Sequence, residues 1–182
     1  MSTEISAAKK LQDELYDWAQ SIAVILSVVI LLFTFVFRII GVEGDSMNPT
    51  LQNHDWMVIS NLFYEPEYGD IVVLTKESFM KNPIVKRVIA TEGQLIDIDF
   101  TTGQVMVDGE ILDEPYIADA THRQLGMEFP QIVPEDSVFV MGDNRNHSSD
   151  SRDPMLGMVH KQYILGRVVF RIFPLSKIGT VA

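Results

Sequence analysis

Residues 104–112 read QVMVDGEIL, two short runs on either side of the pair Asp108-Gly109. Both residues of that pair tolerate a positive φ, so the stretch predicts a tight hairpin between two antiparallel strands. Similar runs, rich in β-branched residues and bounded by turn-forming residues, recur along the chain: DIVVL (70–74), VKRVIA (85–90), LIDIDF (95–100), SVFVMG (137–142) and ILGRVVFRIF (164–173). Residues 113–136 contain Gly126 and three prolines and are expected to form a long loop. The sequence therefore predicts a mainly β domain of antiparallel strands from residue 41 onward.

A long apolar stretch precedes this domain. Residues 19–40 carry only a few polar side chains, and a helix of that length would span about 30 Å, the thickness of a bilayer core. Tyr16 and Trp18 at one end and Arg38 near the other suit the membrane interfaces. The alternatives are a cleaved signal peptide, whose apolar core is usually about 7–15 residues long, and a buried helix of a soluble protein. We expect one retained transmembrane helix over residues 19–40.

The basic residues near this helix predict its orientation. Lys9 and Lys10 precede the helix, whereas the next basic residue after Arg38 is Lys76. Because lysine and arginine favour the cytoplasmic side, residues 1–18 are expected in the cytoplasm and residues 41–182 outside the cell membrane. The sequence thus predicts a single-pass membrane protein with an extracytoplasmic β domain.

Composition excludes several classes of function. The net charge is −11, and nearly all of it lies in residues 39–182, which argues against a nucleic acid partner because phosphate binding needs a basic patch. The chain has no cysteine, which excludes disulfides, thiolate nucleophiles and cysteine-ligated metals. No metal or other cofactor is implied.

Two residues are candidates for nucleophilic chemistry. Ser46 lies in VEGDSMNPTL (42–51), a turn directly after the apolar stretch, and a nucleophilic serine needs a general base. Lys86 lies in a strand whose alternation places Ile84 and Val88 on its own face. Burial there would lower its pKa from about 10.4 toward the range in which an amine accepts a proton near neutral pH. Alternatively, Lys86 reaches out to solvent, with Arg87 on the opposite face.

Histidine offers an alternative base, and a polar loop offers an alternative site. The chain has four histidines, none of which the sequence pairs with an orienting acid: His54, His122, His147 and His160. Residues 142–152, GDNRNHSSDSR, could be read as a calcium loop, but they lack the spacing of an EF-hand, and two arginines would oppose a cation. A network of hydroxyls, carboxylates and guanidinium groups that orients a neutral lysine is the more economical interpretation.

Four blocks after the apolar stretch resemble the type I signal peptidases, particularly the single-anchor form of Gram-positive bacteria: GDSMNPTL (44–51), GDIVVL (69–74), KRVIA (86–90) and GDNRNHSSDSRD (142–153). The resemblance implies a mostly antiparallel β domain in which Ser46 is the acylating nucleophile and Lys86 the general base. Ser148, Asp150 and Arg152 match the residues that position the lysine. The implied substrates are secretory preproteins, cut through an acyl-enzyme after small residues at −3 and −1, the Ala-x-Ala type.

The resemblance also implies how substrate binds. The peptide is expected to add as an extended strand beside residues 41–45 and 83–85. The expected substrate-binding residues are therefore Val42, Glu43, Gly44, Asp45, Pro83, Ile84 and Val85. Gly44 stands where some family members have a serine that donates to the oxyanion, so the oxyanion hole would rest on the backbone N–H of Ser46. The turn after KRVIA is Thr-Glu-Gly-Gln instead of the family's frequent Pro-Gly-Asp, and the excursion over residues 113–136 is short.

Two other functions remain open at this point. A self-cleaving Ser–Lys peptidase of the SOS-repressor type would share the dyad but would carry a DNA-binding domain in place of the apolar stretch. A membrane-tethered β domain without activity could bind exported proteins. The expected partners are secretory preproteins and the lipid bilayer. The sequence does not indicate whether the chain is a monomer or an oligomer.

Overall fold

The computed structural model describes residues 2–76 and 78–181, in two compact units that divide between Arg38 and Ile39. The first unit contains one long helix, α1 (Ser2–Phe35). Its segment Glu14–Thr34 has a mean hydropathy of 1.9 and is apolar and long enough to cross a membrane. The hydroxyls of Ser21, Ser27 and Thr34 each donate to a carbonyl four residues back, so these polar groups are satisfied within the helix.

The bounds of this helix differ from the expected 19–40. The helix begins well before residue 19 and ends at Phe35, and residues 37–40 belong to a strand, β1 (Phe37–Gly41). The short run FRIIG is aromatic and β-branched, and its hydrophobicity cannot distinguish the end of a helix from a strand.

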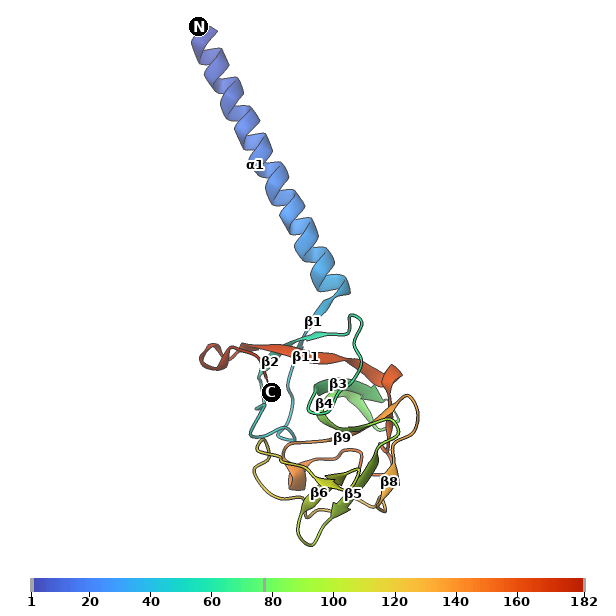
Figure 1. Cartoon of the computed structure of the whole chain (residues 1–182). Helices are drawn as coiled ribbons and strands as arrows, with labels where there is room; N and C mark the ends of the chain where they lie inside the picture. The colour runs from blue at the N-terminus through green and yellow to red at the C-terminus, as the bar shows by residue number, and fades with distance from the viewer. Residues whose placement is uncertain (1, 77, 182) are drawn as a thin grey trace. The chain divides into compact units, whose positions relative to one another are not determined.

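The second unit is built from two antiparallel sheets, so the predicted fold class is confirmed (Figure 1). The seven-stranded sheet has the order β1-β2-β11-β3-β4-β9-β10. Its remaining strands are β2 (Trp56–Ser60), β3 (Ile71–Lys76), β4 (Met80–Thr91), β9 (Ser137–Met141), β10 (Val159–His160) and β11 (Ile164–Phe173). The four-stranded sheet has the order β7-β6-β5-β8, with β5 (Leu95–Asp99), β6 (Gln104–Val107), β7 (Glu110–Ile111) and β8 (Gln131–Ile132).

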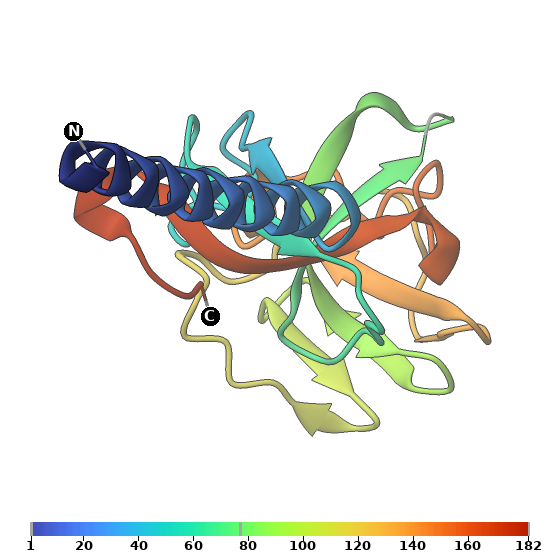
Figure 2. The same cartoon turned by 90° about the horizontal axis from the view of Figure 1, so that it is seen from above.

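Most predicted strands are present at or near their expected bounds, and β11, the long red ribbon across the domain in Figure 2, spans the expected residues 164–173. The hairpin around Asp108-Gly109 joins β6 and β7, and both turn residues have positive φ. β1, β2, β8 and β10 were not predicted. Short 3-10 turns complete the described chain: η1 (Arg145–His147), η2 (Lys161–Tyr163) and η3 (Leu175–Lys177).

One of the hydrophobic clusters supports the turn that carries Ser46. Met47 and Leu51 are 1% and 0% exposed and pack in the same cluster as Val42 and Val85. The backbone around the serine is thus fixed by core packing on its C-terminal side and by Val42 on its N-terminal side. A rigid core therefore holds the hydroxyl at the surface of the domain.

Candidate active site

The structure brings Ser46 and Lys86 together from segments 40 residues apart. Lys86 Nζ lies 2.7 Å from Ser46 Oγ and donates to the carbonyl oxygen of Val85 at 2.8 Å. Lys86 belongs to β4 and is 3% exposed, whereas Ser46 is partly exposed. The lysine therefore faces inward, and the alternative in which it reaches solvent is wrong.

Burial changes the acidity of this lysine. Desolvation lowers the pKa of Lys86 from 10.5 to about 8 because an ammonium loses hydration inside the domain. The charges of Asp150 and Asp143 act in the opposite direction, and the charge of Arg152 adds to the lowering. Desolvation is the largest of these effects, so a substantial fraction of Lys86 is a neutral amine near pH 8. A neutral amine at 2.7 Å can accept the proton of the serine hydroxyl.

Asn144 fixes the backbone of the turn that carries Ser46. Its N–H donates to the Ser46 carbonyl at 3.0 Å, and its side-chain amide donates to the Asp45 carbonyl at 3.1 Å. These two bonds attach the turn to the loop over residues 142–152. This role could not be predicted from the sequence, because an asparagine in a polar loop is common.

The expected positioning residues form a buried ion pair beside the dyad. Asp150 is fully buried and accepts from Arg152 Nε and Nη2, both at 2.8 Å, and from the Gly142 N–H at 3.1 Å. Burial alone would raise the pKa of Asp150, but the hydrogen bonds and charge of Arg152 hold it below its usual value. The carboxylate is therefore ionised. In the described part of the chain it bonds to the arginine and the loop backbone, and no hydrogen bond joins it to Lys86.

Ser148 lies close to the turn that carries Ser46. Its side chain is 1% exposed, and its hydroxyl lies near the Asp150 carboxylate, whose pKa it helps to lower. Ser148 Oγ and the Ser46 carbonyl oxygen both lie against the Cα of Gly142, so a Cβ on that glycine would overlap both atoms. Only glycine permits this close approach between the loop and the turn.

A second buried ion pair, missed by sequence reasoning, adjoins the dyad on the other side of β4. Arg87 donates to Asp143 from Nε at 2.9 Å and from Nη2 at 2.8 Å, and its guanidinium lies 4.0 Å from the ring centre of Tyr116. Thr50 Oγ1 donates to Asp143 at 2.5 Å. The residue next to Lys86 is thus connected to the turn that carries Ser46. Because arginines bind both Asp143 and Asp150, the structure gives the calcium-loop interpretation no support.

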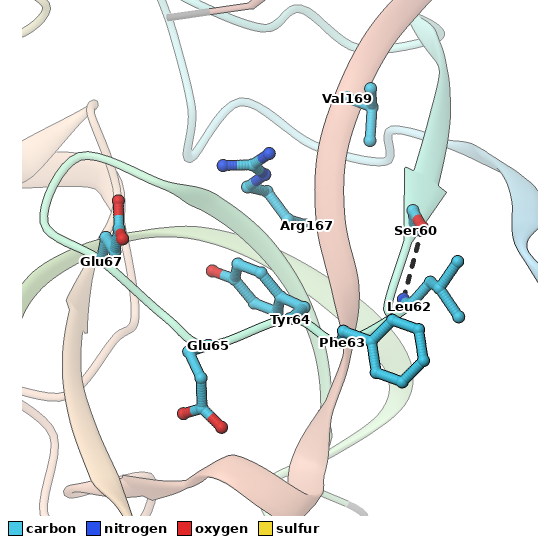
Figure 3. Close-up of a pocket in the computed structure, with 8 residues that line it drawn as sticks. All are labelled: Ser60, Leu62, Phe63, Tyr64, Glu65, Glu67, Arg167 and Val169. Atoms are coloured by element: carbon cyan, nitrogen blue, oxygen red, sulfur yellow. Dashed lines mark hydrogen bonds between the residues drawn. The ribbon is translucent and has the colours of Figure 1, made fainter.

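A cavity of about 220 Å³ opens at the dyad. Its walls include six of the seven expected substrate-binding residues, Pro83 being the exception. Four further residues line it that were not expected to bind substrate: Met47, Met80, His147 and Ser149. A second cavity of about 300 Å³ lies between residues 60–67 and β11 (Figure 3), and neither a lysine nor a histidine is among its described lining residues.

The backbone conformation at Gly44 suits glycine and would strain a serine. Gly44 has φ +88°, a left-handed conformation that strains any residue with a Cβ. Its N–H already donates to Asn53 Oδ1 at 3.1 Å. The N–H of Ser46, by contrast, has no partner within residues 2–76 and 78–181, so it is available to an oxyanion.

The histidines do not form a hydrogen bond with Ser46 in the described structure. His160 accepts from the Gln162 N–H, and the ring of His122 bonds to the Phe100 carbonyl. His54 contacts its neighbour Asn53, and only His147 lines the cavity at the dyad. A histidine base for Ser46 therefore has no geometric support.

A partly exposed hydroxyl beside a buried amine, at the mouth of a small cavity, is an arrangement suited to a serine hydrolase. Residues 15–173 match the family described as "Signal peptidase, peptidase S26". The chain belongs to this family and is a serine peptidase, a protease of the signal peptidase class.

The chain resembles several bacterial relatives over most of its length. It is 34% identical to "Signal peptidase I S" of Bacillus subtilis (strain 168), with 97% of each chain covered. It is 37% identical to "Signal peptidase I" of Leptolyngbya laminosa, with 85% of this chain and 78% of the relative covered. A solved structure of a signal peptidase I from Enterococcus faecalis V583 is 24% identical with a TM-score of 0.47, covering 57% of this chain and 97% of that one.

Proposed function

We propose that this chain is a membrane-bound endopeptidase that removes N-terminal signal peptides from secretory preproteins, using Ser46 as nucleophile and Lys86 as general base. The observation that carries the proposal is the 2.7 Å separation of Ser46 Oγ and Lys86 Nζ, with the lysine 3% exposed. Burial makes the amine a base near neutral pH, and the hydrogen-bond distance lets it act on this hydroxyl.

The reaction proceeds in two stages. The neutral amine of Lys86 takes the proton of Ser46 as Oγ attacks the substrate carbonyl, and the backbone N–H of Ser46 stabilises the oxyanion. The C–N bond then breaks, the leaving amine takes the proton from the Lys86 ammonium, and an acyl-enzyme remains on Ser46. A water molecule, deprotonated by Lys86, then attacks the ester carbonyl. The ester C–O bond breaks, Ser46 Oγ takes the proton from the Lys86 ammonium, and the signal peptide is released with a free carboxylate. Ser148, Asp150 and Arg152 fix the loop against which this dyad is held.

The edge of β4 supports binding of an extended substrate. β4 pairs with β9 only from Arg87 onward, so the described residues before it leave that edge without a strand partner. A peptide can add there as a strand, between residues 83–85 and residues 41–45. Val42, Ile84 and Val85 line the 220 Å³ cavity. Apolar walls around so small a space admit alanine and exclude bulky side chains at −1.

Cleavage of a purified preprotein with an Ala-x-Ala site tests the proposal. Ser46→Ala and Lys86→Ala proteins are expected to fold and to be inactive, whereas a His147→Ala protein keeps its activity and the alkaline limb of its pH profile. A preprotein with phenylalanine at −1 should not be cut. Substantial activity in Lys86→Ala would remove the lysine from the mechanism.

Labelling separates an enzyme from a binding protein with the same fold. A serine-directed acylating inhibitor should attach covalently to the wild-type chain and not to Ser46→Ala. Stoichiometric binding of preprotein without acylation would instead indicate a domain that only holds exported proteins.

We further propose that residues 1–18 lie in the cytoplasm, that the helix crosses the cell membrane, and that residues 41–182 form the extracytoplasmic catalytic domain. The basic pair Lys9-Lys10 before the apolar segment supports this orientation. Because the chain has no cysteine, single cysteines at Gln12 and Glu110 can report it. An impermeant maleimide on intact cells should label only the second. Labelling of only the cysteine at position 12 would show that the orientation is the reverse of the one proposed.

A further inference from the structure

Arg171 on β11 reaches the turn that carries the nucleophile. Its Nη1 donates to the Thr50 carbonyl at 3.1 Å and to Asp55 Oδ2 at 3.0 Å. The side chains of Arg171 and Asp55 are only 15% and 4% exposed, so this ion pair is poorly hydrated. A charge-assisted bond in such a place is stronger and more directional than a surface ion pair.

Thr50 is held from two sides. Its hydroxyl donates to Asp143, which binds Arg87 next to the base, and its carbonyl accepts from Arg171. Thr50 belongs to the same turn as Ser46, which is closed by a bond from the Leu51 N–H to the Met47 carbonyl. The turn is thus fixed between the network around β4 and the guanidinium on β11.

Asp55 extends this support to the segment expected to flank the substrate. Its Oδ2 accepts from the Gln52 N–H at 3.0 Å as well as from Arg171. Its carbonyl accepts from the Val42 N–H at 2.8 Å. The same arginine therefore supports the nucleophile turn through Thr50 and the segment beside the cavity through Asp55.

The end of the chain holds Arg171 in place. We call residues 174–181 the C-terminal hook. Gly179 exchanges two backbone hydrogen bonds with Arg171, and the Lys177 carbonyl accepts from Arg171 Nε at 2.9 Å. Val181 packs against the cluster that contains Met47 and Leu51. The hook thus leaves the guanidinium little freedom to turn away from the nucleophile turn.

We propose that Arg171, held by the C-terminal hook, is a positioning residue that keeps Ser46 at hydrogen-bond distance from Lys86. This rests on the proposed function of that dyad. Arg171 touches no reacting atom, so it acts through the backbone of residues 46–55. A displacement of the nucleophile by about 1 Å reduces rate about 100-fold. Loss of the guanidinium should therefore reduce kcat about 10- to 100-fold and change KM far less.

The experiment compares variants of the full-length chain in detergent on an Ala-x-Ala preprotein. Arg171→Ala is expected to lose kcat, and guanidinium ions well below denaturing concentrations should restore part of it, because the site is partly open to solvent. The same ions should not restore Lys86→Ala. Arg167→Ala is the matched control. Arg167 lies on the same strand, near the ring of Tyr64 (Figure 3), is 47% exposed and pairs with Asp70.

A second variant controls for the case in which Arg171→Ala fails to fold. Arg171→Lys keeps the positive charge but lacks the planar fork that serves the Thr50 and Lys177 carbonyls and Asp55 together, so it should fold and show a kcat between those of wild type and Arg171→Ala. Active-site titration with an acylating inhibitor gives turnover per competent site. Wild-type turnover per site in Arg171→Ala or Arg171→Lys would overturn the proposal. Activity that survives Ser46→Ala would instead overturn the proposed function, whatever the arginine variants do.

Discussion

Replacing Lys86 with methionine should stabilise the folded protein at neutral pH while it abolishes activity. Burial lowers the pKa of this lysine from 10.5 to about 8. At about 1.4 kcal/mol for each pKa unit, folding with the ammonium inside costs about 3 kcal/mol. Methionine fills a similar volume and carries no charge, so it removes this cost.

The gain should depend on pH in a defined direction. Below pH 8 the lysine is protonated in both the folded and the unfolded chain, and the full cost is present. Between about pH 8 and pH 10.5 the folded chain has lost the proton and the unfolded chain still binds it, so the wild-type free energy of unfolding rises with pH. Above that window both states are neutral. The methionine variant lacks this rise.

Urea denaturation of both proteins at pH 7 and near pH 10.5 measures the effect. The hydrogen bonds from Lys86 to Ser46 and Val85 are lost in the variant, at about 1 kcal/mol each, so the net gain at pH 7 is smaller than the charge alone would give. The difference between the proteins should still shift by about 3 kcal/mol across the window, in favour of wild type. Lys81→Met, an exposed lysine of the same strand, is the control. A difference that stays constant with pH for Lys86→Met would refute the reasoning.

The remaining predictions concern the rate and two close contacts. Because only the neutral amine accepts a proton, kcat/KM should rise about tenfold per pH unit below pH 8 and level off above it, measured as initial rates of preprotein cleavage. Arg87→Met leaves Asp143 buried without its cationic partner and should reduce the free energy of unfolding by about 3–5 kcal/mol in urea titrations. Gly142→Ala should reduce kcat about 100-fold, because the added Cβ overlaps Ser148 Oγ and the Ser46 carbonyl; unchanged kcat would show that the loop can move aside.

The sequence predicted those parts of the fold that local patterns determine. β11 and the hairpin at Asp108-Gly109 were found because β-branched runs and turn residues act within a few positions of each other. β2 was missed because WMVIS is short and offers little alternation. β1 was assigned to the helix because apolar residues continue without a break from one element into the next.

In the candidate site, too, only the residues that belong to local sequence patterns could be predicted. Ser46 and Lys86 could be named because each lies in a recognisable block. The support around them depends on contacts between distant segments: Asp143 lies 56 residues from Arg87, and Arg171 lies 121 residues from Thr50. From the sequence alone, an arginine in an alternating strand is expected to face solvent. Only the crossing of β11 beside β2, with the hook folded back, shows that Arg171 faces the nucleophile turn.

The buried arginines explain how the pKa of a lysine can fall to about 8 beside two aspartates. Asp143 and Asp150 both raise the pKa of Lys86, and either carboxylate alone would favour an ammonium that cannot act as a base. Arg87 binds the first and Arg152 the second, each through two nitrogens, so the negative charges are already compensated. Desolvation then outweighs their attraction, and the amine is left with a hydroxyl and a carbonyl as partners. In the proposed mechanism the guanidinium groups therefore act indirectly: they bind the anions that would otherwise hold the proton on Lys86.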